Sequence, residues 1–178
     1  LDLTLPTNKH IVITGPNGSG KSTLLGIIAG ALKPKAGSAT VVSNNIGYVG
    51  VSPYIIPGTL RDNLLYGNEL KKSDNEIMEL VDEFNLFSSN DLSALDRTIN
   101  RKSLSSGQLQ KVSFMRTMLA ETDLLLLDES TSNLDDNSRE KIFSILKNKK
   151  ITIINSTHNP YDFEYDMRIK IIEGKESL

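Results

Sequence analysis

The chain has 178 residues, a net charge of −2 from 20 basic and 22 acidic side chains, and a hydrophobic content of 38%. This length supports one domain with a substantial core, and the balanced charge predicts no nucleic-acid partner. The absence of cysteine excludes disulfides and thiol chemistry. No apolar run reaches membrane-spanning length. Because the chain begins at Leu1 rather than at methionine, we expect a piece of a longer protein.

Apolar periodicity divides the chain into strand and helix patterns. Three of the strand patterns are continuously apolar, at 9–14, 123–128 and 151–155, which is typical of parallel strands buried on both faces. We therefore expect an α/β domain with a mostly parallel central sheet flanked by helices. In chain order, strands are predicted at 2–5, 9–14, 38–42, 46–49, 123–128, 151–155 and 167–172, and helices at 21–32, 59–66, 74–85, 106–120 and 136–148.

The middle of the chain differs from its two ends in this pattern. Between residues 59 and 120 we find helix patterns and no clear strand. We therefore expect one domain over 1–178, in which 1–58 and 121–178 form the sheet core and 59–120 is an inserted helical subdomain.

A glycine-rich loop carries the first functional signal. The segment Gly15-Pro-Asn-Gly-Ser-Gly-Lys-Ser22 matches the pattern G-x-x-x-x-G-K-[ST] and lies between a strand pattern and a helix pattern. Its glycines allow backbone N–H groups to converge on phosphate oxygens, and the following helix points its positive end at the same anion. Lys21 would contact the β- and γ-phosphates, and the Ser22 hydroxyl would ligate Mg²⁺. The expected nucleotide-binding residues here are Gly15, Pro16, Asn17, Gly18, Ser19, Gly20, Lys21, Ser22 and Thr23.

Two adjacent carboxylates follow the apolar run at 124–127. An acidic side chain at the tip of a core strand, beside a phosphate-binding loop, is placed to hold Mg²⁺, and Asp128 has that position. Glu129 would face the γ-phosphate and would orient or deprotonate the attacking water. The alternative interpretation is a strand end followed by ordinary charged loop residues.

A polar segment, Leu104-Ser-Ser-Gly-Gln108, comes at the start of the helix pattern at 106–120. The hydroxyl groups of Ser105 and Ser106, and the free N–H groups at the helix start, could bind a phosphate. From this segment alone, a plain helix N-cap is an equally good interpretation.

In this order, the motifs resemble those of ATP-binding cassette (ABC) ATPases, and the resemblance extends over 1–174. Segment 15–23 resembles the Walker A motif, and 124–129 resembles the Walker B motif with its catalytic glutamate. Segment 104–108 resembles the LSGGQ signature, with Ser106 in place of a glycine. Two further segments follow in the family's order: Ser132-Asn-Leu-Asp135 is similar to the D-loop, and Ser156-Thr-His158 is similar to the H-loop.

The resemblance implies a P-loop NTPase fold of the ABC type, with a truncated N-terminal antiparallel β part and a helical subdomain inserted between Walker A and Walker B. It implies ATP and Mg²⁺ as cofactors, Glu129 and His158 as catalytic residues, and His158 as a contact of the γ-phosphate. It also implies a dimer with a second ABC nucleotide-binding domain, in which the signature and D-loop of one chain complete the ATP site of the other. The residues expected to act there are Ser105, Ser106, Gly107, Gln108 and Asp135. Without the resemblance, His158 would be an ordinary surface residue and Asp135 a helix N-cap.

The chain departs from the family's pattern at the Q-loop. Where the family usually has Tyr-Val-Pro-Gln, this sequence has Tyr48, Val49, Gly50 and Val51. Valine has no polar atom with which to orient water or approach Mg²⁺, so we expect ATP binding to persist and hydrolysis to be weakened. An ordinary variable loop position is the alternative interpretation of Val51.

A second departure concerns the base of the nucleotide. The family's adenine-stacking aromatic would lie upstream of Leu1, outside this sequence. The tyrosines at 48 and 54 come too late in the chain to replace it, so we expect them to be core and surface residues.

The segment Gly58–Gly67 is similar to the pattern that follows the Q-loop in ABC exporters. The resemblance therefore implies a cassette that powers export, with a transmembrane domain fused N-terminally, at the cytoplasmic face of a membrane. Two alternatives stay open: a soluble ABC ATPase without a transport role, and a regulatory cassette that binds ATP and hydrolyses it weakly.

Overall fold

The computed structural model describes residues 2–87, 91–172 and 175–177, and the chain divides into two compact units. The sheet unit comprises Leu1–Gly50, Asp123–Ser130 and Lys149–Leu178, and the helical unit comprises Val51–Thr122 and Thr131–Asn148. These boundaries differ from the expected ones, because 51–58 and 131–148 group with the helices. A hydrogen bond from Asn133 Nδ2 to the Val51 carbonyl joins these two segments within the helical unit.

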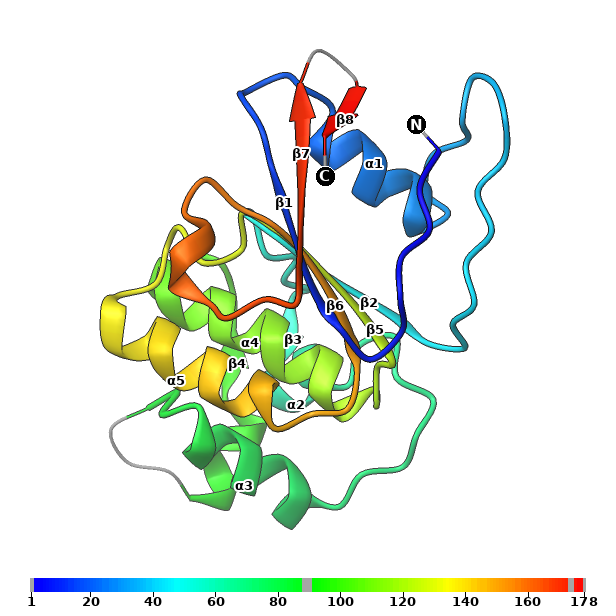
Figure 1. Ribbon diagram of the computed structural model, residues 1–178. Coiled ribbons are helices and arrows are strands. Elements are labelled where there is room, and N and C mark those ends of the chain that lie inside the picture. Colours follow the sequence, from blue (N-terminus) through cyan, green and yellow to red (C-terminus); the bar gives the residue numbers. More distant parts are fainter. Residues whose placement is uncertain (1, 88–90, 173–174, 178) are drawn as a thin grey trace. The chain divides into compact units, whose positions relative to one another are not determined.

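The sheet unit contains a six-stranded sheet with the order β2-β5-β6-β1-β7-β8 (Figure 1). All neighbouring strands are parallel except β7 and β8, which confirms the predicted mostly parallel sheet. The strands are β1 (His10–Thr14), β2 (Ile46–Gly50), β5 (Leu124–Asp128), β6 (Thr152–Ser156), β7 (Met167–Ile172) and β8 (Lys175–Ser177).

The strand register places three chain segments at one edge of this sheet. Asp128 at the end of β5 pairs with Gly50 of β2 on one side and with Ser156 of β6 on the other. Ser156 in turn pairs with Ile13, next to the end of β1. Because parallel strands all end at the same edge, the loops that follow β1, β5 and β6 leave the sheet together, where α/β proteins bind their ligands.

The core of the sheet unit is aliphatic and lies between the sheet and helix α1 (Lys21–Ile28). The helix ends four residues before the predicted end at 32. Gly30 has a left-handed φ of 72°, and the N–H groups of Ala31 and Leu32 both bind the Gly26 carbonyl, which terminates the helix. The buried core residues are Ile11, Ile13, Leu25, Leu124, Leu126, Ile154, Ile169 and Ile171.

Two predicted strands, at 2–5 and 38–42, are wrong: both segments are irregular. Their apolar side chains Leu3, Leu5 and Val41 pack against the core, which accounts for the alternating pattern. Their backbones pair with no strand, so over the described part of the N-terminal region the expected antiparallel β part has no strands. Antiparallel pairing occurs instead between β7 and β8 and in a small separate sheet.

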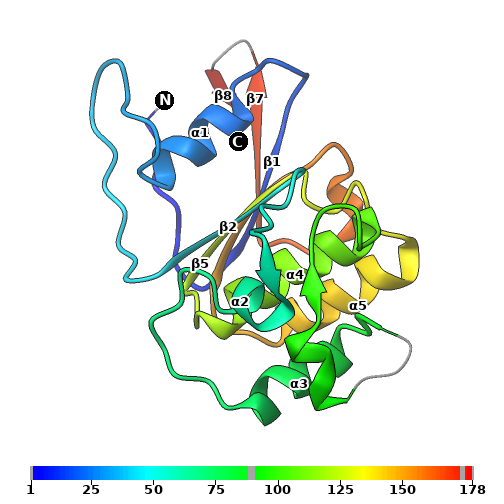
Figure 2. The ribbon, with the colours of Figure 1, turned by 180° about the vertical axis from the view of Figure 1, so that it is seen from behind.

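Over its described residues, the helical unit is built on four α-helices, which Figure 2 shows from behind. Three of them begin with capping boxes, in which Thr59, Ser73 and Ser105 are the N-caps. The prediction that 59–120 lacks strands is wrong in one detail, because the two-residue strand β4 pairs with β3. The elements are β3 (Gly58–Thr59), α2 (Leu60–Leu64), α3 (Asp74–Glu83), a 3₁₀ helix (Leu92–Asp96), β4 (Thr98–Ile99), α4 (Ser106–Leu119) and α5 (Asp136–Lys147).

Neither α4, the 14-residue helix of the helical unit, nor any other helix over the described residues has the length and apolar character needed to cross a bilayer.

A candidate nucleotide-binding site

The glycine-rich loop between β1 and α1 folds around the side chain of Lys21. Lys21 is 5% exposed, and its Nζ donates hydrogen bonds to the carbonyls of Gly15 (3.0 Å) and Pro16 (3.1 Å). Only glycine fits at position 15, because a Cβ there would lie 2.4 Å from the carbonyl oxygen of Ile171. Gly20, with a φ of 99°, takes the left-handed conformation that starts α1 directly after the loop. The loop therefore holds the positively charged Lys21 side chain at the N-terminus of α1.

A cavity of about 430 Å³ opens over this loop. The first turn of α1 contains no acidic residue, and no side chain caps its N–H groups. The Ser19 hydroxyl, in the same loop but not in the cavity lining, is buried without a hydrogen-bond partner among the described residues. The lysine ammonium beside the N-terminus of a helix fits a phosphate chain. The lining residues are Asn17, Gly18, Gly20, Lys21, Ser22, Thr23 and Glu129, of which all but Glu129 belong to the predicted loop.

Asp128, at the end of β5, accepts two hydrogen bonds from different segments. The Ser22 hydroxyl donates to its Oδ1 (3.0 Å), and the Tyr48 hydroxyl donates to its Oδ2 (2.8 Å). The predicted pair of Ser22 and Asp128 thus lies within hydrogen-bond distance. These are hard oxygen ligands with a single carboxylate, the set that Mg²⁺ uses when phosphates supply further oxygens. Among the described residues no cluster of three or more His, Cys, Asp or Glu side chains could hold a metal by itself.

Tyr48 was not expected at this site. Of the core and surface places expected for Tyr48 and Tyr54, both tyrosines have the surface one, at 44% and 60% exposed. Partial burial of the side chain, the hydrogen bond to Asp128 and the charge of that carboxylate raise the Tyr48 pKa above its ordinary value. The hydroxyl therefore stays protonated and acts as a donor at neutral pH. The sequence departs from the family's pattern at Gly50, two residues further along the same strand, but that departure alone does not predict the contact.

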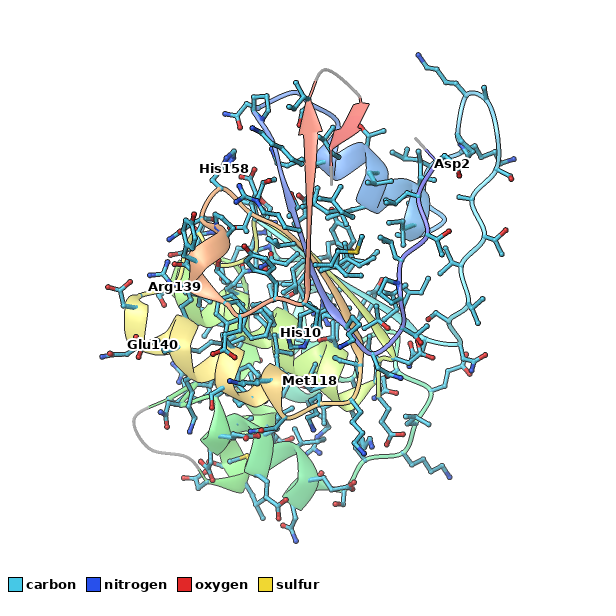
Figure 3. The ribbon with its side chains drawn as sticks, in the orientation of Figure 1. Asp2, His10, Met118, Arg139, Glu140 and His158 are labelled. Atoms are coloured by element: carbon cyan, nitrogen blue, oxygen red, sulfur yellow. The ribbon has the colours of Figure 1, made fainter. Side chains whose placement is uncertain are left out.

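Glu129 and His158 lie at the same edge of the sheet. His158 Nε2 is 2.8 Å from Glu129 Oε1, and the two side chains are 50% and 34% exposed. Figure 3 shows His158 on the loop that follows β6. Glu129 has a φ of 50°, an uncommon value for a residue with a side chain, and its N–H donates to the Ser156 carbonyl (2.9 Å). A carboxylate that lines the cavity and lies beside an imidazole has the arrangement of an acid–base pair.

The predicted signature residues are in the helical unit, at the N-terminus of α4. Ser105 is its N-cap and accepts from the Gln108 N–H (3.2 Å), while the Gln108 Oε1 accepts from the Ser105 N–H (2.9 Å). Ser106 is exposed. A Cβ on Gly107 would lie 3.5 Å from the Asn133 carbonyl oxygen, so the signature segment is next to the D-loop segment.

Asp135 is the N-cap of α5. Its carboxylate accepts from the backbone N–H (2.8 Å) and hydroxyl (2.9 Å) of Ser138. These hydrogen bonds hold the Asp135 pKa below its usual range. The helix-cap interpretations of Ser105 and Asp135 both describe real contacts, and a second role on a nucleotide is compatible with them.

The chain is similar to many proteins of one family. A family model described as "ABC transporter" matches residues 1–132. The Lactococcus lactis lactococcin-A transport/processing ATP-binding protein LcnC is 30% identical, over 97% of this chain and 26% of that protein. The Bacillus subtilis ribosome protection protein VmlR is 31% identical, over 99% of this chain and 31% of that protein. The chain thus spans less than a third of the length of these two curated relatives.

The chain is also similar to a solved structure of an ABC transporter. A chain described as a metal-chelate type ABC transporter in an inward-facing conformation is 26% identical, with a TM-score of 0.76 over 99% of this chain and 74% of that one. The chain belongs to the ABC transporter family.

Proposed function

We propose that this ABC ATPase domain binds and hydrolyses MgATP, and that two copies of the domain, or this domain and a related one, share each ATP. The observation that carries the proposal is the convergence of three groups at one edge of the sheet. Lys21 lies in the loop, Asp128 is bound to Ser22, and Glu129 is bound to His158.

Hydrolysis requires a water positioned against the γ-phosphorus and a group that takes its proton. Glu129 lines the cavity with Lys21, so its carboxylate is available to accept that proton as the water oxygen attacks. The bond from the γ-phosphorus to the bridging oxygen then breaks and leaves ADP and phosphate. His158 orients the Glu129 carboxylate through its Nε2 and would contact the γ-phosphate. Lys21 and the N-terminus of α1 neutralise the phosphate charge.

The residues that would hold Mg²⁺ are Ser22 and Asp128. Held by these two residues, Mg²⁺ would supply positive charge to offset the charge of the leaving group. The Ser22 hydroxyl donates its proton to Asp128, so the lone pairs of the Ser22 oxygen are free for the ion.

The proposed second half of the ATP site is the N-terminus of α4. Ser106 is exposed there, and the first turn of α4 contains no acidic residue, so a second nucleotide-bound domain could place its phosphate against it. In this arrangement Ser105, Ser106, Gly107, Gln108 and Asp135 act on the ATP of the partner domain.

The dimer requirement is tested by the rate of phosphate release at increasing concentrations of the chain. If two chains complete each site, turnover per chain rises with concentration and follows the dimer fraction measured by sedimentation. A rate per chain that stays constant while the protein remains monomeric would contradict the shared site.

Export across a membrane is the proposed use of this cycle, with a transmembrane domain in the same or an associated chain and the cassette at its cytoplasmic face. The likeness to a lactococcin-A transport protein supports it. The second candidate is an ABC ATPase without a transport role, which the likeness to a ribosome protection protein favours. Apolar spans of about 20 residues in the parent gene would distinguish the two.

We further propose that Val51 weakens hydrolysis, since it offers no polar atom where the family has glutamine. Val51 is 43% exposed, so glutamine can replace it without disturbing the core. The variant Val51→Gln should hydrolyse ATP faster than the natural sequence, by about tenfold if one hydrogen bond to the water or ion is gained. The measurement is steady-state phosphate release at saturating ATP. An unchanged rate would show that Val51 does not slow hydrolysis.

A further inference from the structure

The Tyr48 side chain has a contact that the proposed chemistry does not yet use. Tyr48 projects from β2, and its hydroxyl donates a 2.8 Å hydrogen bond to Asp128 Oδ2. The other oxygen, Oδ1, accepts from Ser22 at 3.0 Å. The Asp128 carboxylate is therefore held at both oxygens, by Ser22 at one and by Tyr48 of the neighbouring strand at the other.

The strand geometry explains how the ring reaches this position. In the β2–β5 register Tyr48 is opposite Leu126, and Gly50 is opposite Asp128. Residues 48 and 50 project from the same face of β2, since side chains alternate along a strand. A Cβ on residue 50 would lie 3.2 Å from Tyr48 Cε1, closer than an ordinary contact. Glycine at position 50 thus leaves room for the ring beside Asp128.

We propose that Tyr48 is a positioning residue for the metal site, that it holds Asp128 in the orientation required to bind the water shell of Mg²⁺, and that Gly50 is the residue that permits this contact. The proposal rests on the proposed role of Asp128 in MgATP binding. An ionised carboxylate has about four lone-pair positions. Ser22 and Tyr48 occupy one on each oxygen, which leaves one on each oxygen for metal-bound water.

The contact has the properties expected of a support for a metal ligand. Ligands of metal sites are themselves hydrogen-bonded, and loss of such a support typically weakens metal binding by about 10- to 100-fold. Tyr48 is nearly half exposed, so its hydroxyl is not needed to satisfy a buried group of the core. A purely structural tyrosine at this position would influence folding stability and nucleotide binding regardless of the metal.

The test is the variant Tyr48→Phe, which removes the hydroxyl and keeps the ring. Mn²⁺, used in place of Mg²⁺, is titrated into the full chain with ATP, and its binding is followed by electron paramagnetic resonance. We expect Mn²⁺ to bind about 10- to 100-fold more weakly than to the natural chain. Affinity for a fluorescent ATP analogue in EDTA, and the thermal unfolding midpoint, should be unchanged.

Gly50→Ala provides a second, independent test, because the added Cβ crowds the Tyr48 ring and should displace the hydroxyl without removing it. This variant should also weaken Mn²⁺ binding. The double variant with Tyr48→Phe should bind Mn²⁺ no more weakly than Tyr48→Phe alone. The matched control is Tyr165→Phe, an exposed tyrosine of the same unit, which should bind Mn²⁺ like the natural chain.

Two results would overturn the inference: unchanged Mn²⁺ affinity in Tyr48→Phe, or an equal loss of nucleotide affinity with and without the metal. Failure of the broader proposal gives a different result. If the natural chain with ATP bound no Mn²⁺, or if Asp128→Asn bound it equally well, then Asp128 would not hold the ion and the proposed function would be at fault.

Discussion

Replacing Glu129 with glutamine should lower the rate of ATP hydrolysis by about 10²- to 10⁴-fold and leave ATP binding nearly unchanged. Glutamine keeps the size of the side chain but cannot accept the proton of the attacking water. The carboxylate lies 2.8 Å from His158 Nε2, and among the described residues that line the cavity Glu129 is the one with a carboxylate. Single-turnover phosphate release separates this chemical step from binding.

The matched control is Glu140, an exposed glutamate of α5 that is not among the residues lining the cavity, since Glu140→Gln removes the same charge. That variant should hydrolyse ATP at the natural rate. A Glu129→Gln variant that retains more than about a tenth of the natural single-turnover rate would exclude Glu129 as the general base.

Replacing Lys21 with alanine should weaken ATP binding by about 10- to 100-fold, the value of a charge-assisted hydrogen bond of about 1.5 to 3 kcal/mol. In the described structure Lys21 is 5% exposed, and its ammonium donates hydrogen bonds to the loop carbonyls of Gly15 and Pro16. The same ammonium is within the cavity lining, where it can bind phosphate oxygens. Equilibrium binding of a fluorescent ATP analogue measures the loss.

Lys33 is exposed and belongs to the same unit, so Lys33→Ala is the control for a change in net charge alone. It should bind ATP like the natural chain. The thermal unfolding midpoint of Lys21→Ala shows whether the loop remains folded. If a folded Lys21→Ala chain bound ATP with natural affinity, the glycine-rich loop would not be the phosphate site.

The sheet was predictable because its signal is local. The apolar runs at 123–128 and 151–155 have the composition of strands buried on both faces, and both form parallel strands close to the predicted bounds. The segments 2–5 and 38–42 also carry a strand pattern, but pairing requires a neighbouring strand. Their side chains pack on the core without one.

The candidate site was predictable to a similar degree. Asp128 and Glu129 were predicted from their place at the end of an apolar run, and His158 only from the resemblance to the family. The parallel register explains why the three lie at one edge of the sheet. The Tyr48 contact was not predictable, because it depends on the β2–β5 register and on the space that Gly50 leaves. A residue pattern does not contain that information.

The most direct test of the shared ATP site uses two inactive variants in one solution. Lys21→Ala disables the phosphate loop, and Ser106→Asp places a negative charge at the start of α4, where it suits the helix but repels phosphate. A dimer of the two retains one site with an intact loop from one chain and an intact signature from the other. Equal amounts should therefore regain about a quarter of the natural ATPase rate, since half of randomly formed dimers are mixed. A mixture no more active than its separate components would contradict a site built from two chains.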